Sequence, residues 1–424
     1  MQLPSNNPAL KSWVEIDAHS DFPIQNLPFG IFSVRGGDKK VGVALGNYII
    51  DLAELAELGY LSDTEVPEFV YYSDFLNDFM EYGREGTRAV RERLSELFKE
   101  ENNELKSNEE DVERVLVPLG DAKLHLPVRV GDYTDFYSSK EHATNVGTLF
   151  RDPANALFPN WLHIPVGYHG RSSSIIVSGQ PIHRPKGQQR PNDSEPPVFG
   201  PCKLLDFELE MAFITYQGKP LGQSISIDEA EDFMFGMCLF NDWSARDIQK
   251  WEYVPLGPFL AKNFASTVSP WIVTMDALEP FRTATPTQDP KPFEYLQFEG
   301  DKSFDINLEM YIQPEGKEET RVSLSNYKYM YWNPSQQLAH HTINGCNINA
   351  GDLMGSGTIS GPTPESFGSM LELAWKGTKP LTLKDGSERK FIMDGDTVIQ
   401  RGFCEKDGVR IGFGEAKNKI LPAI

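Results

Sequence analysis

Three acidic side chains occupy alternate positions in one short stretch, at Asp206, Glu208 and Glu210. The positions around them are apolar: Leu205, Phe207, Leu209, Met211 and Phe213. Alternation with a period of two predicts a β-strand that packs its apolar face on a core. If the acidic face also turns inward, crowding raises the carboxyl pKa values unless a cation lies among the oxygens. The pattern favours a metal site, with a solvated acidic strand as the alternative.

A further carboxylate, Asp242, follows the apolar run 233–240, which has the length of a buried strand. The end of such a strand is a frequent place for functional side chains. A helix is expected to begin after it, with Ser244 as the capping residue.

The expected helix carries three polar side chains on one face, because Arg246, Gln249 and Tyr253 fall at positions i, i+3 and i+7. A cation, an amide and a phenol together indicate a surface that holds carboxylate or carbonyl oxygens. The alternative is an ion pair between Arg246 and a neighbouring acid.

The polar, aromatic loop 132–139 and the residue His142 add two candidates. Asp135 can supply a hard oxygen ligand, and His142 can act as a general base. The alternative is a turn aspartate and a surface histidine.

Lys262 lies among glycine, phenylalanine and alanine in the loop 255–271, with Ser266 nearby. A lysine in an apolar setting is costly unless it is paired. Asp135, Glu208, Glu210 and Asp242 carry four negative charges, of which a divalent cation would leave two. Lys262 and Arg246 would neutralise that remainder.

Other polar groups are weaker candidates. Tyr168 and Arg171 can line a pocket, and Arg151 can bind an anionic end of a substrate. The pair His340–His341 suggests a metal, but neighbours on a helix point about 100° apart. A packing or capping role is therefore favoured for this pair.

The composition is that of an ordinary globular protein large enough for two or three domains, with 424 residues and 40% hydrophobic content. A net charge of -21 argues against nucleic acid and anionic membranes as partners. The four cysteines show no C-x-x-C spacing and are expected to be reduced thiols. There is no signal pattern or membrane-length apolar run, so a cytoplasmic location is expected.

Short strands separated by turns dominate the chain, and a mainly β fold is expected. Residues 1–28 are expected to form a surface arm, followed by an antiparallel meander, a helix over 86–100 and a solvated linker over 100–113. The expected strands are 31–34, 41–45, 48–52, 175–177, 204–215, 233–239, 304–312, 370–375, 390–393 and 397–400. A further helix is expected to begin at Asn333–Pro334. The domain boundary is placed between residues 115 and 127.

Several long motifs together resemble the fumarylacetoacetate hydrolase family. They are DYTDFYSS with His142, WLH-PVGYHGR, LLDFELEMAF, NDWSARDIQ-WEYVPLGPF, MYW-P-QQL-HH, SGTISG and SFGSMLELAWKGTK. Motifs of this length in this order are highly specific. The resemblance covers the chain from about residue 125 onward, and the small amino-terminal β region fits it too.

The resemblance implies a small SH3-like barrel over residues 1–126 and a mixed β-sandwich-roll catalytic domain over 127–424, assembled as a homodimer. It implies hydrolysis of the carbon–carbon bond of 4-fumarylacetoacetate, a dicarboxylate 1,3-diketo compound, to fumarate and acetoacetate. That reaction is the last step of tyrosine catabolism, and so of phenylalanine catabolism. The implied cofactors are Ca²⁺ or Mg²⁺.

The resemblance also implies roles for individual residues. Metal contacts are expected from Asp135, Glu208, Glu210, Asp242, Lys262 and Ser266. His142 would activate water and Glu372 would orient it, while Arg246, Gln249 and Lys262 would stabilise the oxyanion and the departing carbanion. Substrate contacts are expected from Tyr137, Arg151, Tyr168, Gln249, Tyr253 and Thr358.

The chain departs from the family pattern in the Lys262 loop, where Ala265 and Ser266 replace an expected glycine and threonine. Serine keeps the hydroxyl, whereas Ala265 is unfavourable if the turn needs a positive φ. The amino-terminal arm is several residues longer than usual. Two alternatives remain: a related acylpyruvate hydrolase, decarboxylase or tautomerase, and a calcium-dependent β-sandwich binding module.

Overall fold

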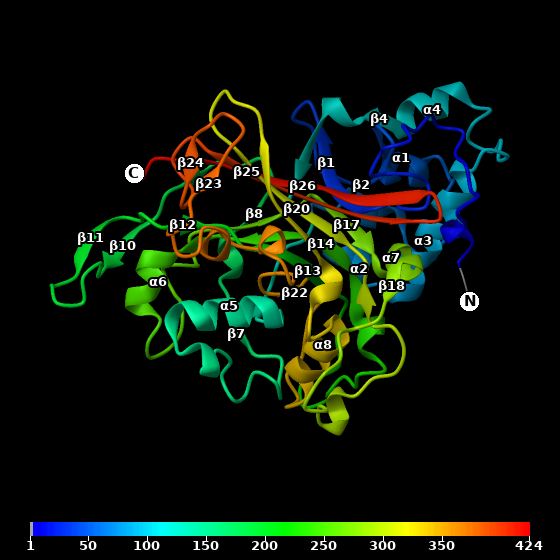
Figure 1. The fold of residues 1–424 in the computed structure, drawn as a ribbon. Helices are drawn as coiled ribbons and strands as arrows, with labels where there is room; N and C mark the ends of the chain where they lie inside the picture. Colours follow the sequence, from blue (N-terminus) through cyan, green and yellow to red (C-terminus); the bar gives the residue numbers. More distant parts are fainter. Residues whose placement is uncertain (1–2) are drawn as a thin grey trace.

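The computed structural model describes residues 3–424, and its main feature is a thirteen-stranded sheet (Figure 1). Along its path the strands are β4 (Leu116–Pro118), β3 (Tyr48–Asp51), β2 (Lys40–Leu45), β1 (Phe29–Val34), β17 (Trp271–Thr274), β14 (Met234–Asp242), β13 (Leu209–Thr215), β22 (Leu353–Gly355), β6 (Tyr133–Phe136) and β7 (Gly167–His169). Off this path, β5 (Ala122–His125) pairs with β1, β16 (Ser266–Val268) with β14, and β8 (Ile175–Val177) with β16.

A second, five-stranded sheet contains β21 (Thr320–Asn326), β20 (Asn307–Gln313), β25 (Thr397–Lys406), β26 (Val409–Leu421) and β9 (Ile182–His183). Four short strand pairs complete the β-structure: β10 (Lys186–Gln189) with β11 (Val198–Pro201), β12 (Leu205–Asp206) with β15 (Ser244–Ala245), β18 (Arg282–Thr283) with β19 (Ser303–Phe304), and β23 (Leu381–Thr382) with β24 (Glu388–Arg389). The expected mainly β fold is confirmed.

The α-helices are short apart from α3 and α5. They are α1 (Leu52–Glu57), α2 (Asn77–Met80), α3 (Gly83–Phe98), α4 (Glu109–Val115), α5 (Lys140–Phe150), α6 (Arg246–Glu252), α7 (Met275–Leu278), α8 (Pro334–Thr342) and α9 (Met370–Leu373). Helices α1, α3 and α4 lie beside the amino-terminal strands, at one end of the molecule (Figure 1). Within residues 3–424, no helix has the length and apolarity that crossing a bilayer requires.

The amino-terminal meander continues directly into the rest of the main sheet. Strand β1 pairs with β17 through Phe29 opposite Ile272 and Gly30 opposite Trp271. One buried apolar cluster accordingly includes Phe29 and Leu94 together with Ile272. The SH3-like description of this region and the division at residue 126 stay predictions.

Most expected elements are present, including the apolar face of α3 and the helix α8, which begins with an Asn333–Gln336 capping box. The expected surface arm is wrong in part. The fully buried Arg91 of α3 donates hydrogen bonds to Ser5, Asn6 and the carbonyl of Gln25, so this segment is fixed to the core.

Five local expectations are also wrong. Residues 370–373 form helix α9, because the Ser369 side chain caps its first turn, and 390–393 is not a strand. The expected strand 204–215 is interrupted at residues 207–208, and Ser244 lies in β15 without capping α6. The expected linker 100–113 contains residues 109–113 of α4.

Candidate active site

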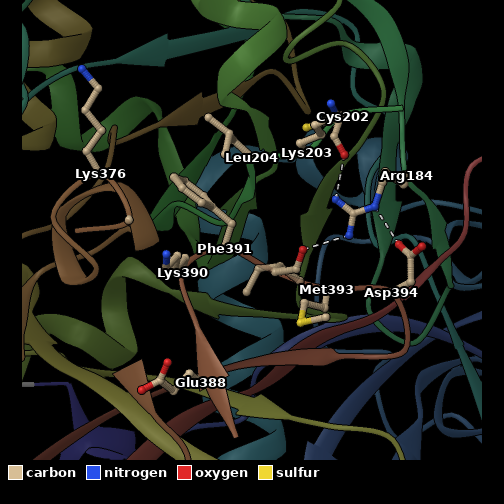
Figure 2. A pocket seen from close by; sticks show the side chains of 12 residues that line it. Arg184, Cys202, Lys203, Leu204, Lys376, Glu388, Lys390, Phe391, Met393 and Asp394 are labelled. Carbon is tan, nitrogen blue, oxygen red and sulfur yellow. Dashed lines mark hydrogen bonds and ion pairs between the residues drawn. The ribbon is translucent and has the colours of Figure 1, made fainter. Parts of the chain in front are cut away.

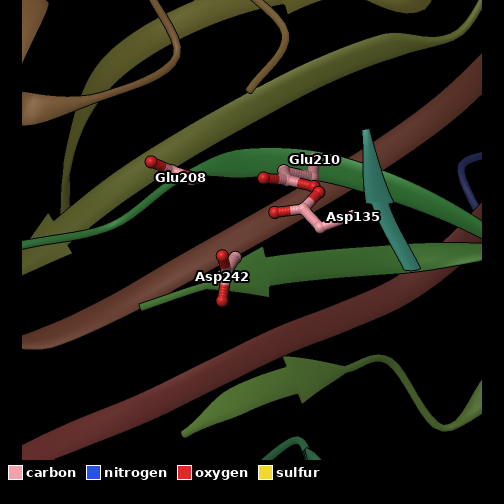
Figure 3. A group of neighbouring side chains, drawn as sticks. All are labelled: Asp135, Glu208, Glu210 and Asp242. Carbon is pink, nitrogen blue, oxygen red and sulfur yellow. The ribbon is translucent and has the colours of Figure 1, made fainter. Parts of the chain in front are cut away.

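Four buried carboxylates converge where strands β14, β13 and β6 of the main sheet lie near one another (Figure 3). One oxygen from each of Asp135, Glu208, Glu210 and Asp242 lies within 4.8 Å of the others. Asp135 comes from β6, Glu210 from β13, Asp242 from the end of β14, and Glu208 from the segment before β13. Segments distant in the sequence thus form one group of acids, which we call the carboxylate cluster.

Gly355 of β22 makes this convergence possible, since β22 pairs with both β13 and β6. A Cβ at Gly355 would lie 3.1 Å from Asp135 Oδ1 and 3.3 Å from Glu210 Oε2. The absence of a side chain allows the two carboxylates to approach each other across the intervening strand.

Two cations neutralise one side of the cluster. Lys262 Nζ lies 2.6 Å from Asp242 Oδ2 and 2.8 Å from Glu208 Oε2, and Arg246 Nη1 lies 2.8 Å from Glu208 Oε1. Burial alone would raise the pKa of Glu208, but Lys262 and Arg246 outweigh it and hold the pKa below its usual value. Burial would lower the pKa of Lys262, but Asp242 and Glu208 raise it, so the lysine stays charged.

The other side of the cluster has no cation among the described residues. Asp135 Oδ1 and Glu210 Oε1 are buried without a hydrogen-bond partner. Burial raises the pKa of Asp135 and that of Glu210 well above their normal values. The negative charge of Asp242 raises the pKa of Asp135 further, and the negative charge of Asp135 raises the pKa of Glu210 further. Unpaired buried carboxylate oxygens are costly, and a hard divalent cation would satisfy them. The residues therefore fit an oxygen-ligated metal, as the sequence predicted.

Ser266 lies where the sequence analysis placed it, and its hydroxyl donates to Asp242 Oδ1 at 2.9 Å. Ala265 is buried and does not have a positive φ, so alanine fits the Lys262 loop without strain.

Beside the cluster, His142 and Glu372 form a buried pair, with His142 Nδ1 2.7 Å from Glu372 Oε2. Glu372 comes from α9 and also accepts hydrogen bonds from Asn145 and Ser360, both at 2.9 Å, and from Ser369 at 2.8 Å. Burial would raise the pKa of Glu372, but His142 and these donors hold it below normal. With Nδ1–H donated to a fixed carboxylate, His142 presents Nε2 as a proton acceptor.

The three donors to Glu372 are not among the residues predicted from the sequence. Asn145 lies three residues after His142 on α5, and this helical spacing is a signal that could have identified it. Ser369 lies three residues before Glu372, and this capping-box spacing is also a signal that could have identified it. Ser360 lies 12 residues before Glu372 and carries no such signal.

The structure brings some expected substrate residues to the site. The Tyr168 hydroxyl donates to Asp242 Oδ2 at 3.2 Å, and the Tyr137 ring lies edge-on to His142 with centroids 5.2 Å apart. Gln249 Oε1 accepts from Arg246 Nη1 at 3.2 Å. Thr358 has a buried hydroxyl without a partner and follows Gly357, whose N–H donates to Glu210.

The side chains of Arg151 and Tyr253 make no hydrogen bond, ion pair or ring contact with another expected site residue within residues 3–424. Arg151 lies over the Phe158 ring, 4.1 Å from its centroid, and Tyr253 is 52% exposed. His340 Nδ1 lies 3.0 Å from the Tyr295 hydroxyl, and His341 Nε2 lies 3.0 Å from the Thr134 hydroxyl. These contacts agree with the expected packing role.

A cavity of about 750 Å³ lies elsewhere, and none of its lining residues belongs to the cluster. Arg184 is held at its wall by Asp394, 2.7 Å away, and by the carbonyls of Cys202 and Ile392 (Figure 2). We do not assign the chemistry to this cavity.

Buried acids converge beside an oriented histidine on a mainly β scaffold, an arrangement that suits a metal-dependent enzyme with a general base. The family model described as fumarylacetoacetate (FAA) hydrolase C-terminal matches residues 132–421, and that described as fumarylacetoacetase N-terminal matches 25–127. The chain belongs to the fumarylacetoacetate hydrolase family.

Curated relatives cover nearly the whole chain. A fumarylacetoacetase of Dictyostelium discoideum is 54% identical over 98% of each chain, and one of Homo sapiens is 53% identical over 97% of this chain and 99% of its own. A solved fumarylacetoacetate hydrolase from Exiguobacterium antarcticum matches 93% of this chain and 99% of its own, with a TM-score of 0.52 and 17% identity. That last likeness shows the fold.

Proposed function

We propose that this enzyme hydrolyses the carbon–carbon bond of 4-fumarylacetoacetate, giving fumarate and acetoacetate, as the last step of tyrosine and phenylalanine catabolism. The observation that carries the proposal is identity of 53–54% to curated fumarylacetoacetases over nearly the full chain. The carboxylate cluster and the His142–Glu372 pair support the proposal, because they place a candidate metal site beside a candidate general base.

In the proposed reaction, water adds to a ketone carbon, and His142 Nε2 takes its proton. Glu372 keeps the imidazole oriented and stabilises its charged form. Arg246 and Lys262 lie where negative charge develops on the carbonyl oxygen, and Gln249 supports Arg246. The carbon–carbon bond then breaks, the hydroxyl remains on the fumarate fragment, and the acetoacetate carbon leaves with the electron pair and takes up a proton.

We assign the metal ligands as Asp135, Glu208, Glu210 and Asp242, with Lys262 and Ser266 contacting Asp242. A set of oxygen ligands favours Ca²⁺ or Mg²⁺ over softer metals. When bound, such an ion supplies Lewis-acid stabilisation of the enolate in the leaving fragment. The paired side chains Lys262 and Arg246 keep Glu208 ionised and ready to coordinate.

The substrate carries a carboxylate at each end, which suits phenols and cations around the pocket. We assign substrate contacts to Tyr137, Arg151, Tyr168, Gln249, Tyr253 and Thr358. Tyr137 and Tyr168 are supported by their positions beside His142 and Asp242. Arg151 and Tyr253 lie further out, and we assign them to the mouth of the site.

We also propose that the enzyme is a homodimer and that it is located in the cytoplasm. Large apolar side chains are exposed in the loop after α6, among them Leu256 at 96% and Phe259 at 67%, and a second subunit would cover such side chains. All four cysteines are free, as expected in a reducing compartment.

The test is loss of fumarylacetoacetate absorbance, compared with several other 1,3-diketo acids. Purified enzyme should turn over fumarylacetoacetate in the presence of Ca²⁺ or Mg²⁺, and a chelator or His142→Ala should abolish turnover. Wild-type enzyme that stays inert with both metals would remove the assignment. Faster turnover of a smaller acylpyruvate would point to a related hydrolase.

A further inference from the structure

The third acid of the alternating stretch, Asp206, has a different environment from Glu208 and Glu210. The chain is interrupted between β12 and β13, and Asp206 pairs with Ser244 of β15, whereas Glu208 bridges to Ser369. Asp206 is 0% exposed and is not a member of the carboxylate cluster. Its carboxylate therefore serves something other than the metal site.

One contact of Asp206 is with the first turn of α9. Oδ1 accepts a hydrogen bond from the N–H of Met370 at 2.6 Å, and Oδ2 accepts one from that of Leu371 at 3.0 Å. These are the first two residues of α9, and their N–H groups have no partner within the helix. The same turn carries Glu372, so Asp206 fixes the segment that orients His142.

The other contact is with Arg246, whose Nε lies 2.8 Å from Asp206 Oδ2. Arg246 Nη1 is held by Glu208 and Gln249. Its Nη2 is buried and has no hydrogen-bond partner among the described residues. The guanidinium is planar and rigid, so fixing two nitrogens also fixes the direction of the third.

We infer that Asp206 is a positioning residue with two effects. It holds Arg246 so that Nη2 points toward the reacting carbonyl oxygen, and it fixes the position of α9, which carries Glu372 of the His142–Glu372 pair. The buried carboxylate of Asp206 thus links His142, the proton acceptor, to Arg246, which stabilises the negative charge of the transition state. This inference rests on the proposed function, because it assigns roles within that reaction.

The test compares Asp206→Asn with Asp247→Asn. The asparagine in the first variant keeps the shape of the side chain but replaces one carboxylate oxygen by an amide NH2. That group faces either the Met370 N–H or both the Leu371 N–H and Arg246 Nε, so one or two hydrogen bonds are lost. Asp247 is a matched control on α6, since it accepts the N–H of Lys203 at 2.7 Å and contacts none of the site residues described above. We expect Asp206→Asn to lower kcat about 100-fold with KM within about threefold, as for an interaction made in the transition state. Asp247→Asn should stay within about threefold in both.

Folding is followed by urea denaturation of each variant. A merely structural Asp206 would lower the midpoint while leaving kcat of the folded protein unchanged, and that result overturns the inference. If Asp206→Asn does not fold, Arg246→Lys decides, because lysine keeps the charge but cannot hold Asp206, Glu208 and substrate together. Activity of Arg246→Lys within about threefold of wild type would overturn the inference. Inert wild-type enzyme would instead refute the proposed function.

Discussion

Glu208 interacts with both kinds of charge in the site, because it forms ion pairs with Arg246 and Lys262 and also belongs to the carboxylate cluster. Glu208→Gln removes one ligand charge while nearly preserving the volume. We expect Ca²⁺ affinity to fall at least about tenfold, or about 1.4 kcal/mol, with no change in fold. Calorimetric titration measures the affinity, and Glu405→Gln on the surface is the control for net charge. Equal affinity for Glu208→Gln and wild type would show that the cluster is misassigned.

Asn145 tests how the histidine is oriented. Asn145→Ala removes one of the two donors to Glu372 Oε1 and leaves the direct His142 contact intact. Glu372 then loses one of the bonds that keep its pKa low, and we expect kcat to fall about tenfold with KM nearly unchanged. Thr144→Ala, which removes a hydrogen bond to the Lys140 carbonyl within the same helix, is the control. If both variants have the same kcat, Asn145 does not support the pair.

At the scale of elements, β22 determines how closely β6 and β13 bring their acids together. Gly355→Ala places a methyl group against Asp135 and Glu210 without requiring a positive φ. The carboxylates must shift by a few tenths of an ångström, and we expect weaker metal affinity with the fold retained. Gly200→Ala in β11, where a Cβ meets no atom within 4 Å, is the control. If Gly355→Ala binds metal with the same affinity as wild type, the spacing of the strands accommodates the methyl group without displacing the two carboxylates.

Some of the strands and helices that carry the site could be predicted from the sequence, and others could not. Period two correctly indicated a buried strand, and the end of the run 233–240 correctly placed Asp242. The interruption between β12 and β13 could not be predicted, because it depends on contacts with β15 and Ser369 from distant segments. The sequence analysis expects a strand over residues 370–375, whereas capping by Ser369 and Asp206 makes a short helix there.

For the whole molecule, the position of α3 against the rest of the sheet depends on a partly buried ionic network. Asp276 of α7 lies 3.0 Å from Arg84 and 2.7 Å from Arg88, both on α3. Burial would raise the pKa of Asp276, but the two arginines outweigh it and the pKa lies below its normal value. This contribution to stability is full above the unfolded pKa of about 3.9, and it is lost as pH falls through the lower folded value.

Asp276→Asn should therefore lower the free energy of unfolding by about 3 kcal/mol at pH 7, since it leaves two arginines without their carboxylate. The deficit should persist down to about pH 4 and shrink below that, because the wild-type carboxylate is then protonated. Urea denaturation at pH 7, 5 and 3 measures it. Asp232→Asn is the control, since Asp232 contacts the same Arg84 at 2.8 Å with a side chain 69% exposed, and it should cost less than about 1 kcal/mol. A deficit for Asp276→Asn that grows toward low pH would contradict this account of how α3 is held.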